Sequence, residues 1–218
     1  MQSKLNAALG EALKAAGVVP VLTIEAPVVG VEVARALQRG GLNLIEITLR
    51  TAAAIEVIRQ IKTEVPEVRV GAGTVLDPDQ AAKAIAAGAR FIVSPGMTPR
   101  LLEAAQTWPV PYLPGAATAS EAMALSDLGY GVLKFFPAEP AGGVAYLKAM
   151  AAPLANVVFC PTGGIDAANA SAYLALPNVA AVGGSWMASR ADIRAGNWAS
   201  ITDRARRAMD KMGAGKTV

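Results

Sequence analysis

The sequence predicts an α/β fold, a single (β/α)8 TIM barrel with an extra N-terminal helix, and three observations carry this prediction. Short apolar runs rich in β-branched residues alternate with alanine-rich helical stretches along the 218 residues. The runs recur at a spacing of roughly 20 to 26 residues, the length of one strand–helix unit. Their number matches the eight strands of such a barrel. They begin at Val18, Asn43, Arg69, Arg90, Pro111, Gly131, Val157 and Val179.

The stretches between the runs carry helix boundaries. Asp77 and Pro78 are typical of a cap and a first helical residue, and Gly88 of a helix end. Before the first run, residues 1–17 predict a short amphipathic helix, with leucines four residues apart. An open doubly wound sheet is the alternative, but no G-x-G-x-x-G motif follows the first strand. With no Ser/Gly-rich linker, we expect one domain over 1–218, ending in a flexible tail at 213–218.

Composition narrows the class of protein. Apolar residues make up 53% of the chain and the net charge is +3, which indicates a packed core and argues against a nucleic-acid surface. The single cysteine, Cys160, allows no internal disulfide, so a cytoplasmic protein is expected and Cys160 is interpreted as a packed thiol. The chain has no histidine, the commonest zinc ligand. No apolar run is long enough for a membrane span, and we expect no membrane partner.

Alternation along residues 43–50 places polar side chains inside the predicted barrel. Successive residues of a strand point to opposite faces, and the apolar face of this strand must meet the helices. Glu46, Thr48 and Arg50 therefore point inward. The alternative is a structural ion pair between Glu46 and Arg50.

The run GVLKFFPAE, residues 131–139, places a lysine inside an apolar strand. Lys134 shares its face with Val132 and Phe136, so it also points inward, toward Glu46. Burying an unpaired ammonium costs several kcal/mol. Lys134 is therefore a snorkelling side chain, the partner of a buried salt bridge, or a catalytic amine. The inward Glu46 and Arg50 favour catalysis.

Glycine pairs follow the last two predicted strands, in PTGGID at 161–166 and VGGSWM at 182–187. Glycines expose backbone N–H groups to an anion, and such barrels often bind phosphate at this place. We therefore interpret them as a phosphate site and expect a side chain at Gly184 to occupy the anion's space. The alternative is that they only form turns. Thr74, in GAGTV, offers a further hydroxyl near the barrel mouth.

Seven motifs occur in one order: EITLRT, GAGTV, SPG, LPG, KFFPAE, FCPTGG and GGSW. Over about residues 18–198 the chain resembles the bacterial 2-keto-3-deoxy-6-phosphogluconate (KDPG) aldolases, which are class I lyases of the Entner–Doudoroff pathway. The resemblance implies a homotrimeric barrel that cleaves KDPG, a phosphorylated 2-oxo sugar acid, to pyruvate and D-glyceraldehyde 3-phosphate. It implies no metal and no cofactor.

The resemblance also implies roles for single residues. Lys134 becomes the Schiff-base lysine and Glu46 the general acid and base. The resemblance implies that Arg50 and Thr74 bind the pyruvate carboxylate. It implies that the phosphate is bound by Gly163, Gly164, Gly184 and Ser185. Pro95, Phe136 and Thr162 line the pocket. The first strand matches only loosely, so its substrate contacts stay open.

Two other functions stay open at this stage. Within the same chemistry, the substrate could be 4-hydroxy-2-oxoglutarate or the galactonate epimer of KDPG. From a different class, the chain could be a non-catalytic phosphate-binding barrel. An inward Lys134–Glu46 pair argues against the second, because a binding module does not need it.

Overall fold

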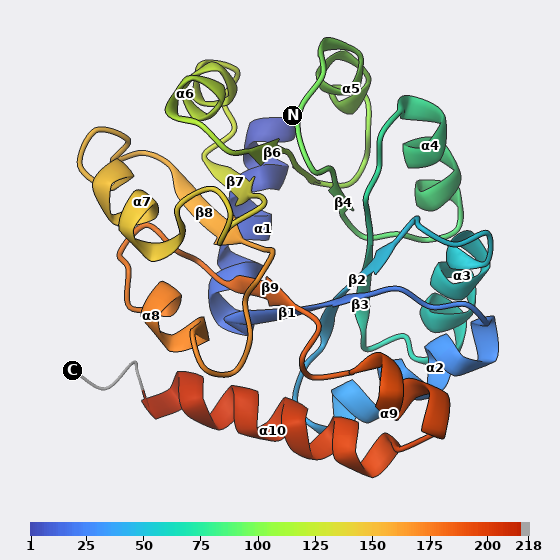
Figure 1. Cartoon of the computed structure of the whole chain (residues 1–218). Helices are drawn as coiled ribbons and strands as arrows, with labels where there is room; N and C mark the ends of the chain where they lie inside the picture. Colours follow the sequence, from blue (N-terminus) through green and yellow to red (C-terminus); the bar gives the residue numbers. More distant parts are fainter. Residues whose placement is uncertain (215–218) are drawn as a thin grey trace.

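The computed structural model describes residues 1–214, with side chains through residue 210. A ring of parallel strands lies inside a circle of helices (Figure 1). The strands are β1 Val18–Leu22, β2 Leu44–Thr48, β3 Arg69–Gly73, β4 Ile92–Val93, β5 Tyr112–Leu113, β6 Gly115–Ala116, β7 Val132–Phe135, β8 Val158–Pro161 and β9 Val182–Gly184. The helices are α1 Gln2–Ala16, α2 Pro27–Arg39, α3 Ala54–Glu64, α4 Pro78–Ala86, α5 Pro99–Ala105, α6 Ala119–Asp127, α7 Gly143–Met150, α8 Ala170–Leu174, α9 Arg190–Ala195 and α10 Trp198–Ala214.

The predicted barrel is confirmed, with two weak places in its ring. One sheet has the order β5-β4-β3-β2-β1-β9, and a second has the order β6-β7-β8, with parallel pairs throughout. Isolated parallel bridges join β8 to the β9 region, from Phe159 to Val179 and from Thr162 to Gly183. Only Pro114 separates β5 from β6. A proline has no N–H for the ladder, so the single run predicted from Pro111 is seen as two short strands.

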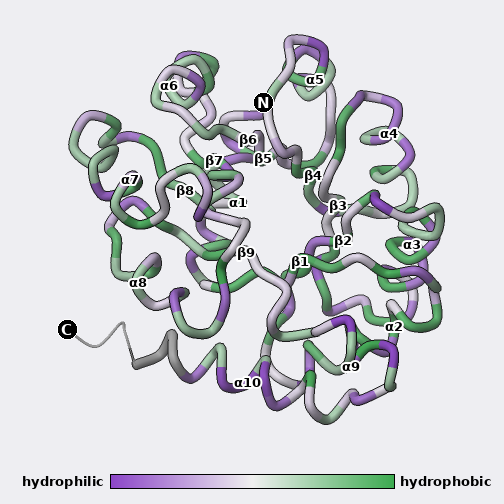
Figure 2. Tube along the Cα trace, viewed as in Figure 1, coloured by the Kyte–Doolittle hydropathy of each residue, from purple (hydrophilic) through white to green (hydrophobic). Residues whose placement is uncertain are grey.

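Two apolar cores confirm the alternation of the strands. Ile45, Ile47 and Leu133 belong to the large core between the strands and the helices. Leu44 and Val132, from the opposite faces of the same strands, belong to a smaller core inside the barrel. Figure 2 shows hydrophobic residues along both the strands and the helices, as two nested cores require. The inner core fills one end of the barrel and leaves the other end for polar side chains.

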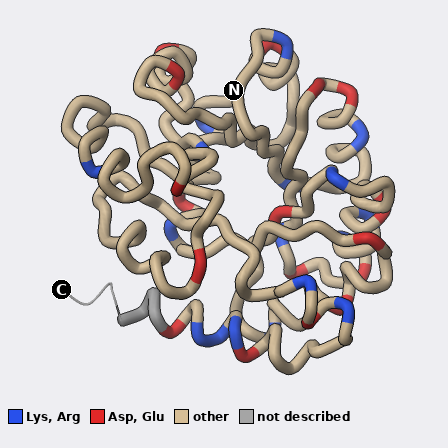
Figure 3. The backbone as a smooth tube through the Cα atoms, in the orientation of Figure 1, with Lys and Arg blue, Asp and Glu red and all other residues tan. Residues whose placement is uncertain are grey.

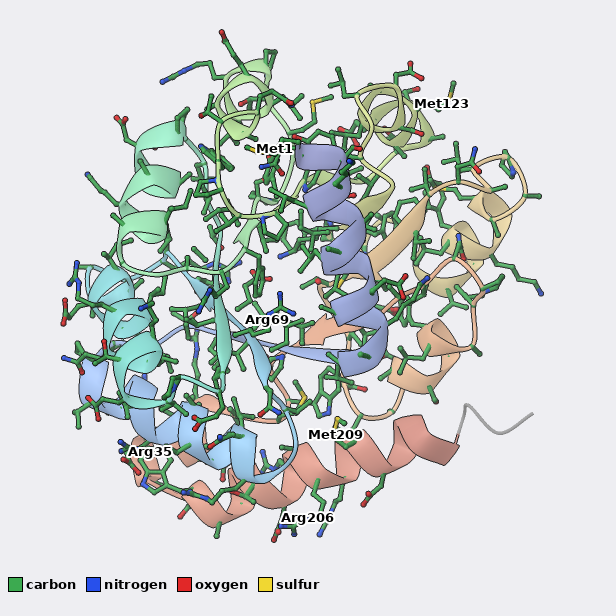
Figure 4. The ribbon with its side chains drawn as sticks, turned by 180° about the vertical axis from the view of Figure 1, so that it is seen from behind. Met1, Arg35, Arg69, Met123, Arg206 and Met209 are labelled. Atoms are coloured by element: carbon green, nitrogen blue, oxygen red, sulfur yellow. The ribbon has the colours of Figure 1, made fainter. Side chains whose placement is uncertain are left out.

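Helix α1 closes the end of the barrel at which the strands begin. Seen from behind, it lies across the opening (Figure 4). The predicted helix is confirmed, but its buried face differs from a simple leucine stripe. Leu9 and Leu13 are buried, whereas Leu5 is only partly buried, and Asn6 and Gln2 are buried instead. Short polar side chains are buried here because they bond to strand backbone, which leucine cannot do.

These polar bonds are numerous. The Asn6 amide nitrogen donates to the carbonyls of Tyr112, at 3.0 Å, and Val132, at 2.9 Å. The Asn6 oxygen accepts from the Val132 N–H at 2.9 Å. Gln2 likewise donates to the carbonyls of Trp108 and Val110, and its oxygen accepts from the Tyr112 N–H. The side chains of α1 therefore provide hydrogen-bond partners for backbone groups at the strand ends, which would otherwise be buried and unpaired.

The predicted start of α4 is confirmed in detail. The Asp77 side chain accepts from the Gln80 N–H at 2.8 Å, and Pro78 is the first helical residue. Gly88 lies just past the helix with φ of 101°, a left-handed conformation that favours glycine. Short, well-defined helix ends of this kind return the chain to the next strand.

Charged residues lie mostly along the outer helices (Figure 3). Within residues 1–214, no helix is both long and apolar enough to cross a membrane. Helix α10 includes the first two residues of the tail predicted at 213–218, and residues 215–218 lie outside the described part.

Candidate functional site

Lys134 and Glu46 meet inside the barrel. The Lys134 Nζ donates to Glu46 Oε1 at 3.2 Å and lies 3.5 Å from Oε2. The residues are 5% and 3% exposed, respectively, so water screens their interaction little. Lys134 comes from β7 and Glu46 from β2, and alternation turns both inward, as predicted. The contact is short enough for a proton to pass between the two groups.

Glycines on β3 make room for the carboxylate. A Cβ placed on Gly73 would lie 1.9 Å from Glu46 Oε1, and β2 and β3 are neighbours in the sheet. A Cβ on Gly71 would lie 2.3 Å from the Phe91 ring, which belongs to the inner core. Any side chain at Gly73 would therefore displace Glu46. Gly73 is thus a packing requirement of the buried pair, and Gly71 is one of the inner core.

The inner core forms a dry floor beneath the pair. It contains Leu9, Leu13, Val19, Leu44, Phe91, Val93, Leu113, Val132, Cys160, Ala180 and Ala181. Cys160 lies beside Lys134 in the β7–β8 register. Burial raises the pKa of the Cys160 thiol to about 12, even though the Lys134 charge acts in the opposite direction. The thiol therefore stays protonated and packs as an apolar group, in keeping with the sequence interpretation.

A cavity of about 230 Å³ opens at the end of the barrel where the strands finish. It is lined by several predicted residues, namely Arg50, Phe136, Thr162, Gly163, Gly164, Gly184 and Ser185. Phe136 connects the cavity with the buried pair, since its ring centroid lies 5.5 Å from the Lys134 Nζ. Arg50 lies just past β2 and is exposed at the mouth. The structure thus brings the predicted cation, the glycine pairs and the buried lysine to one end of the barrel.

Four predicted residues are not among those that line this cavity, namely the buried pair Lys134 and Glu46, and also Thr74 and Pro95. Thr74 follows β3 with φ of 58°, a left-handed conformation that costs a non-glycine residue about 1 kcal/mol or more. The Pro95 carbonyl oxygen would lie 2.2 Å from a Cβ on Gly115, the register partner of Lys134. Both residues therefore follow strands at the same end of the barrel, next to the strands that carry the pair.

The glycines have packing reasons to be glycine, which corrects one expectation. A Cβ on Gly184 would lie 2.0 Å from the Trp186 ring, so it would strike the protein rather than enter the space of an anion. Gly163 and Gly164 have φ of 107° and 79°. Substitution of any of them would damage the barrel, so the turn-forming role considered above is real. Polar side chains at the cavity are the sharper probes of a bound anion.

Residues 163 and 164 are also held by the segment that follows Lys134. The Ala138 and Glu139 N–H groups donate to the carbonyls of Thr162 and Gly163 at 2.9 and 3.0 Å. The Glu139 carboxylate accepts a hydrogen bond from the Tyr173 hydroxyl. Burial, and next the bond to Glu139, raise the pKa of Tyr173. The glycine loop is therefore placed by the same strand that carries the lysine.

Sequence reasoning missed two polar residues of the cavity, Thr23 and Arg190. Thr23 directly follows β1, the strand whose contacts were left open. Arg190 is exposed and lies five residues beyond Ser185, after an irregular turn. A cation shortly after a glycine-rich strand end is the signal that could have revealed it. The side chain adds a positive charge beside the glycines.

A larger cavity, of about 820 Å³, lies between the start of β1, α8 and α10. Its lining is mostly small and apolar, and the described titratable side chains in it are cations, namely Lys14, Arg204 and Arg207. Lys134 and Glu46 line neither of the two cavities, but Phe136, whose ring lies beside the Lys134 Nζ, lines the smaller one. Within residues 1–214, no cluster of three or more His, Cys, Asp or Glu residues could hold a metal ion. The smaller cavity is therefore the candidate site.

Known proteins match this chain over most of its length. A family model described as KDPG and KHG aldolase matches residues 9–204. The KHG/KDPG aldolase of Escherichia coli strain K12 is 48% identical over 193 residues, covering 88% of this chain and 91% of that protein.

Two solved structures are similar throughout. KDPG aldolase from Legionella pneumophila, with pyruvate captured as a covalent carbinolamine intermediate, is 44% identical, covers 91% of this chain and 97% of its own, and has a TM-score of 0.88. The KDPG aldolase of Zymomonas mobilis ZM4, solved with 3-phosphoglycerate, is 42% identical. The match covers 95% of this chain and 96% of that chain, with a TM-score of 0.86.

Proposed function

Because the chain belongs to the KDPG and KHG aldolase family, we propose that it cleaves KDPG to pyruvate and D-glyceraldehyde 3-phosphate through an imine on Lys134. The observation that carries this proposal is the buried contact of 3.2 Å between Lys134 and Glu46. A primary amine can form an imine with the substrate ketone, and the imine accepts the electrons of a breaking C–C bond. The enzyme is a lyase whose reaction is carried by its own side chains.

Glu46 prepares the amine for attack. An ammonium is not a nucleophile, so Lys134 must lose a proton before its nitrogen can add to C2 of the substrate. Glu46 Oε1 is in contact with that proton and accepts it. The carbinolamine then loses its hydroxyl as water, with the proton returned by Glu46. This leaves a protonated imine between Lys134 and C2.

The same carboxylate serves the cleavage step. Glu46, again ionised, takes the proton of the C4 hydroxyl, the C3–C4 bond breaks, and its electron pair moves through C3 and C2 onto the imine nitrogen. The aldehyde leaves and an enamine remains. Protonation at C3 restores the imine, and water releases pyruvate and the free amine. The dry inner core beneath the pair strengthens these electrostatic interactions.

The substrate lies with its two anionic ends apart. Arg50 and Thr74 hold the carboxylate. Backbone N–H groups and one hydroxyl receive the phosphate, from Gly163, Gly164, Gly184 and Ser185, and Arg190 adds a positive charge at this end. Pro95, Phe136 and Thr162 shape the space between. Two arginines at different strand ends suit a substrate with two separated anions.

4-Hydroxy-2-oxoglutarate is a second candidate substrate, since the reacting pair is separate from the glycine-rich end. The E. coli relative is named for both substrates. The galactonate epimer of KDPG uses the same groups. A non-catalytic phosphate-binding barrel is disfavoured, because an ammonium and a carboxylate buried at 5% and 3% exposure serve no purpose in phosphate binding.

Borohydride trapping tests the proposal. The protein is incubated with pyruvate, reduced, digested, and mapped by mass spectrometry. We expect one pyruvate-derived adduct, at Lys134, and none in a Lys134→Met variant that is folded by circular dichroism. The exposed Lys4 and Lys148 are internal controls for unspecific reduction. An adduct elsewhere, or none in the wild type, contradicts the proposal.

We also propose a cytoplasmic homotrimer. The resemblance to the family supports it. Exposed apolar side chains offer surface for association, namely Met123 on α6, Leu128 directly after α6, and Leu76 after β3. Sedimentation equilibrium of the purified chain measures the mass of the assembly. A monomer or dimer at micromolar concentration contradicts the trimer.

A further inference from the structure

Thr23 occupies the middle of the candidate site. It directly follows β1, is partly buried, and lines the cavity together with Arg50 and Gly184. In the sheet, β1 lies between β9, which ends in Gly184, and β2, which carries Glu46. Thr23 thus lies between the strand end proposed for the phosphate and the strand proposed for proton transfer. An extended substrate must pass it.

The hydrogen bonds of Thr48 determine what Thr23 can offer. The Thr48 hydroxyl is buried, donates to the Leu22 carbonyl at 3.0 Å, and lies 2.9 Å from the Thr23 hydroxyl. A hydroxyl has a single proton. Because a carbonyl can only accept, the Thr48 proton belongs to Leu22. Thr23 must therefore donate its own proton to Thr48.

The Thr23 oxygen consequently presents only acceptor lone pairs to the cavity. An acceptor repels a carboxylate or a phosphate and suits the hydroxyl of a sugar acid. We propose that Thr23 accepts a hydrogen bond from the C5 hydroxyl of the substrate and so contributes to specificity. This rests on the proposed function, in which the C4 hydroxyl gives its proton to Glu46. The C5 hydroxyl is then the one free to donate.

The backbone around Thr23 is held on both sides. Thr48 bonds to the carbonyl of Leu22, and the Thr51 hydroxyl donates to the carbonyl of Ile24 at 2.6 Å. Thr51 is not among the residues that line the cavity. A Thr51→Val variant therefore loosens the same segment without removing an acceptor from the site. It is the matched control for Thr23→Val.

The test uses the reverse reaction, with pyruvate and one of two aldehydes. D-Glyceraldehyde 3-phosphate carries the hydroxyl that becomes the C5 hydroxyl, and 3-phosphooxypropanal lacks it. We expect Thr23→Val to lower kcat/KM for the first aldehyde by about 3- to 10-fold relative to the second, as for one hydrogen bond between neutral groups. Thr23→Ser, which keeps the hydroxyl, should retain most of the preference, and Thr51→Val should change both aldehydes equally.

Equal losses on both aldehydes in Thr23→Val would overturn the proposal and leave Thr23 a partner of Thr48 alone. The proposal would also be overturned if Thr51→Val reduced the preference for D-glyceraldehyde 3-phosphate as much as Thr23→Val does. Borohydride trapping with pyruvate separates this failure from failure of the proposed function. If wild type and Thr23→Val both form the Lys134 adduct, the imine chemistry stands whichever way the aldehydes are discriminated.

Discussion

At the end of the barrel closed by α1, the amides of Asn6 and Gln2 bond to strand backbone, whereas at the opposite end an ammonium and a carboxylate bond to each other. The closed end satisfies neutral groups with several partners each. Among the described side chains, both hydrogen bonds of the Lys134 Nζ go to Glu46. A satisfied neutral network stabilises a fold. A buried ion pair with few other partners adds little stability, which agrees with a chemical role.

The largest effect on activity is expected when the Glu46 carboxylate is removed, and it tests the contrast between the buried pair and the amide network. Glu46→Gln keeps the shape of the side chain and removes its basicity. We expect kcat/KM for KDPG to fall by about 10²- to 10⁴-fold, the usual contribution of general acid–base catalysis. Steady-state kinetics and thermal unfolding are measured together. Near-normal turnover in a folded Glu46→Gln protein would make the pair structural, like the network at the other end.

Asn6→Ala makes the opposite test, at the closed end. It leaves the Tyr112 carbonyl and both backbone groups of Val132 without their side-chain partner. We expect the free energy of unfolding to fall by about 3 kcal/mol, since an unsatisfied buried group costs about 1–3 kcal/mol. Urea denaturation measures it, and kcat/KM well below the transition should stay unchanged.

Lys4→Ala is the control for Asn6→Ala, because Lys4 is an exposed residue of the same helix. It should leave both stability and activity near the wild-type values. A large loss of kcat/KM in folded Asn6→Ala would show that the two ends of the barrel are not separable.

The reacting pair was predictable from sequence and much of its setting was not. Strict alternation in β2 and β7 is enough to turn Glu46 and Lys134 inward, because neither strand contains a bulge. Asn6 was missed because a helical pattern identifies apolar faces and gives no weight to a buried amide. Thr23 and Arg190 follow strands rather than belonging to them, so alternation does not orient them. The collision of a Cβ on Gly184 with the Trp186 ring, two residues away, is not encoded in the periodicity of the strand.

A smaller effect distinguishes the proposed phosphate end from the buried pair. Arg190→Ala should raise KM for KDPG by about tenfold and leave 4-hydroxy-2-oxoglutarate unaffected, since a charge-assisted hydrogen bond contributes about 1.5–3 kcal/mol when fully formed and less at an exposed site. Arg194→Ala, on the same helix but outside the cavity lining, is the matched control. Equal effects on both substrates would remove Arg190 from phosphate binding.

The smallest predicted effect concerns Cys160, at the boundary between the inner core and the pair. Burial raises its pKa to about 12 in the folded protein, whereas an unfolded cysteine titrates near 8.5. Unfolding therefore releases a proton above about pH 8.5, and stability must fall as the pH rises from there toward 12. Between pH 9 and 10 we expect the wild type to lose about 1 kcal/mol more than Cys160→Ala.

Urea denaturation of both proteins at the two pH values gives this difference and cancels the contribution of the tyrosines. Equal losses in wild type and Cys160→Ala would mean that the thiol reaches water, and that the floor beneath Lys134 is not dry.

The bonds of Asn6 have a consequence for how the chain is made. Its partners, Tyr112 and Val132, lie 106 and 126 residues further along the sequence. On a ribosome, α1 is synthesised before β5 and β7, so its docking site does not exist until β7 has been made. Contacts of such long sequence separation form late, because the loop they close is costly in entropy. Helix α1 is therefore placed only after strands that lie 106 and 126 residues further along the chain have formed.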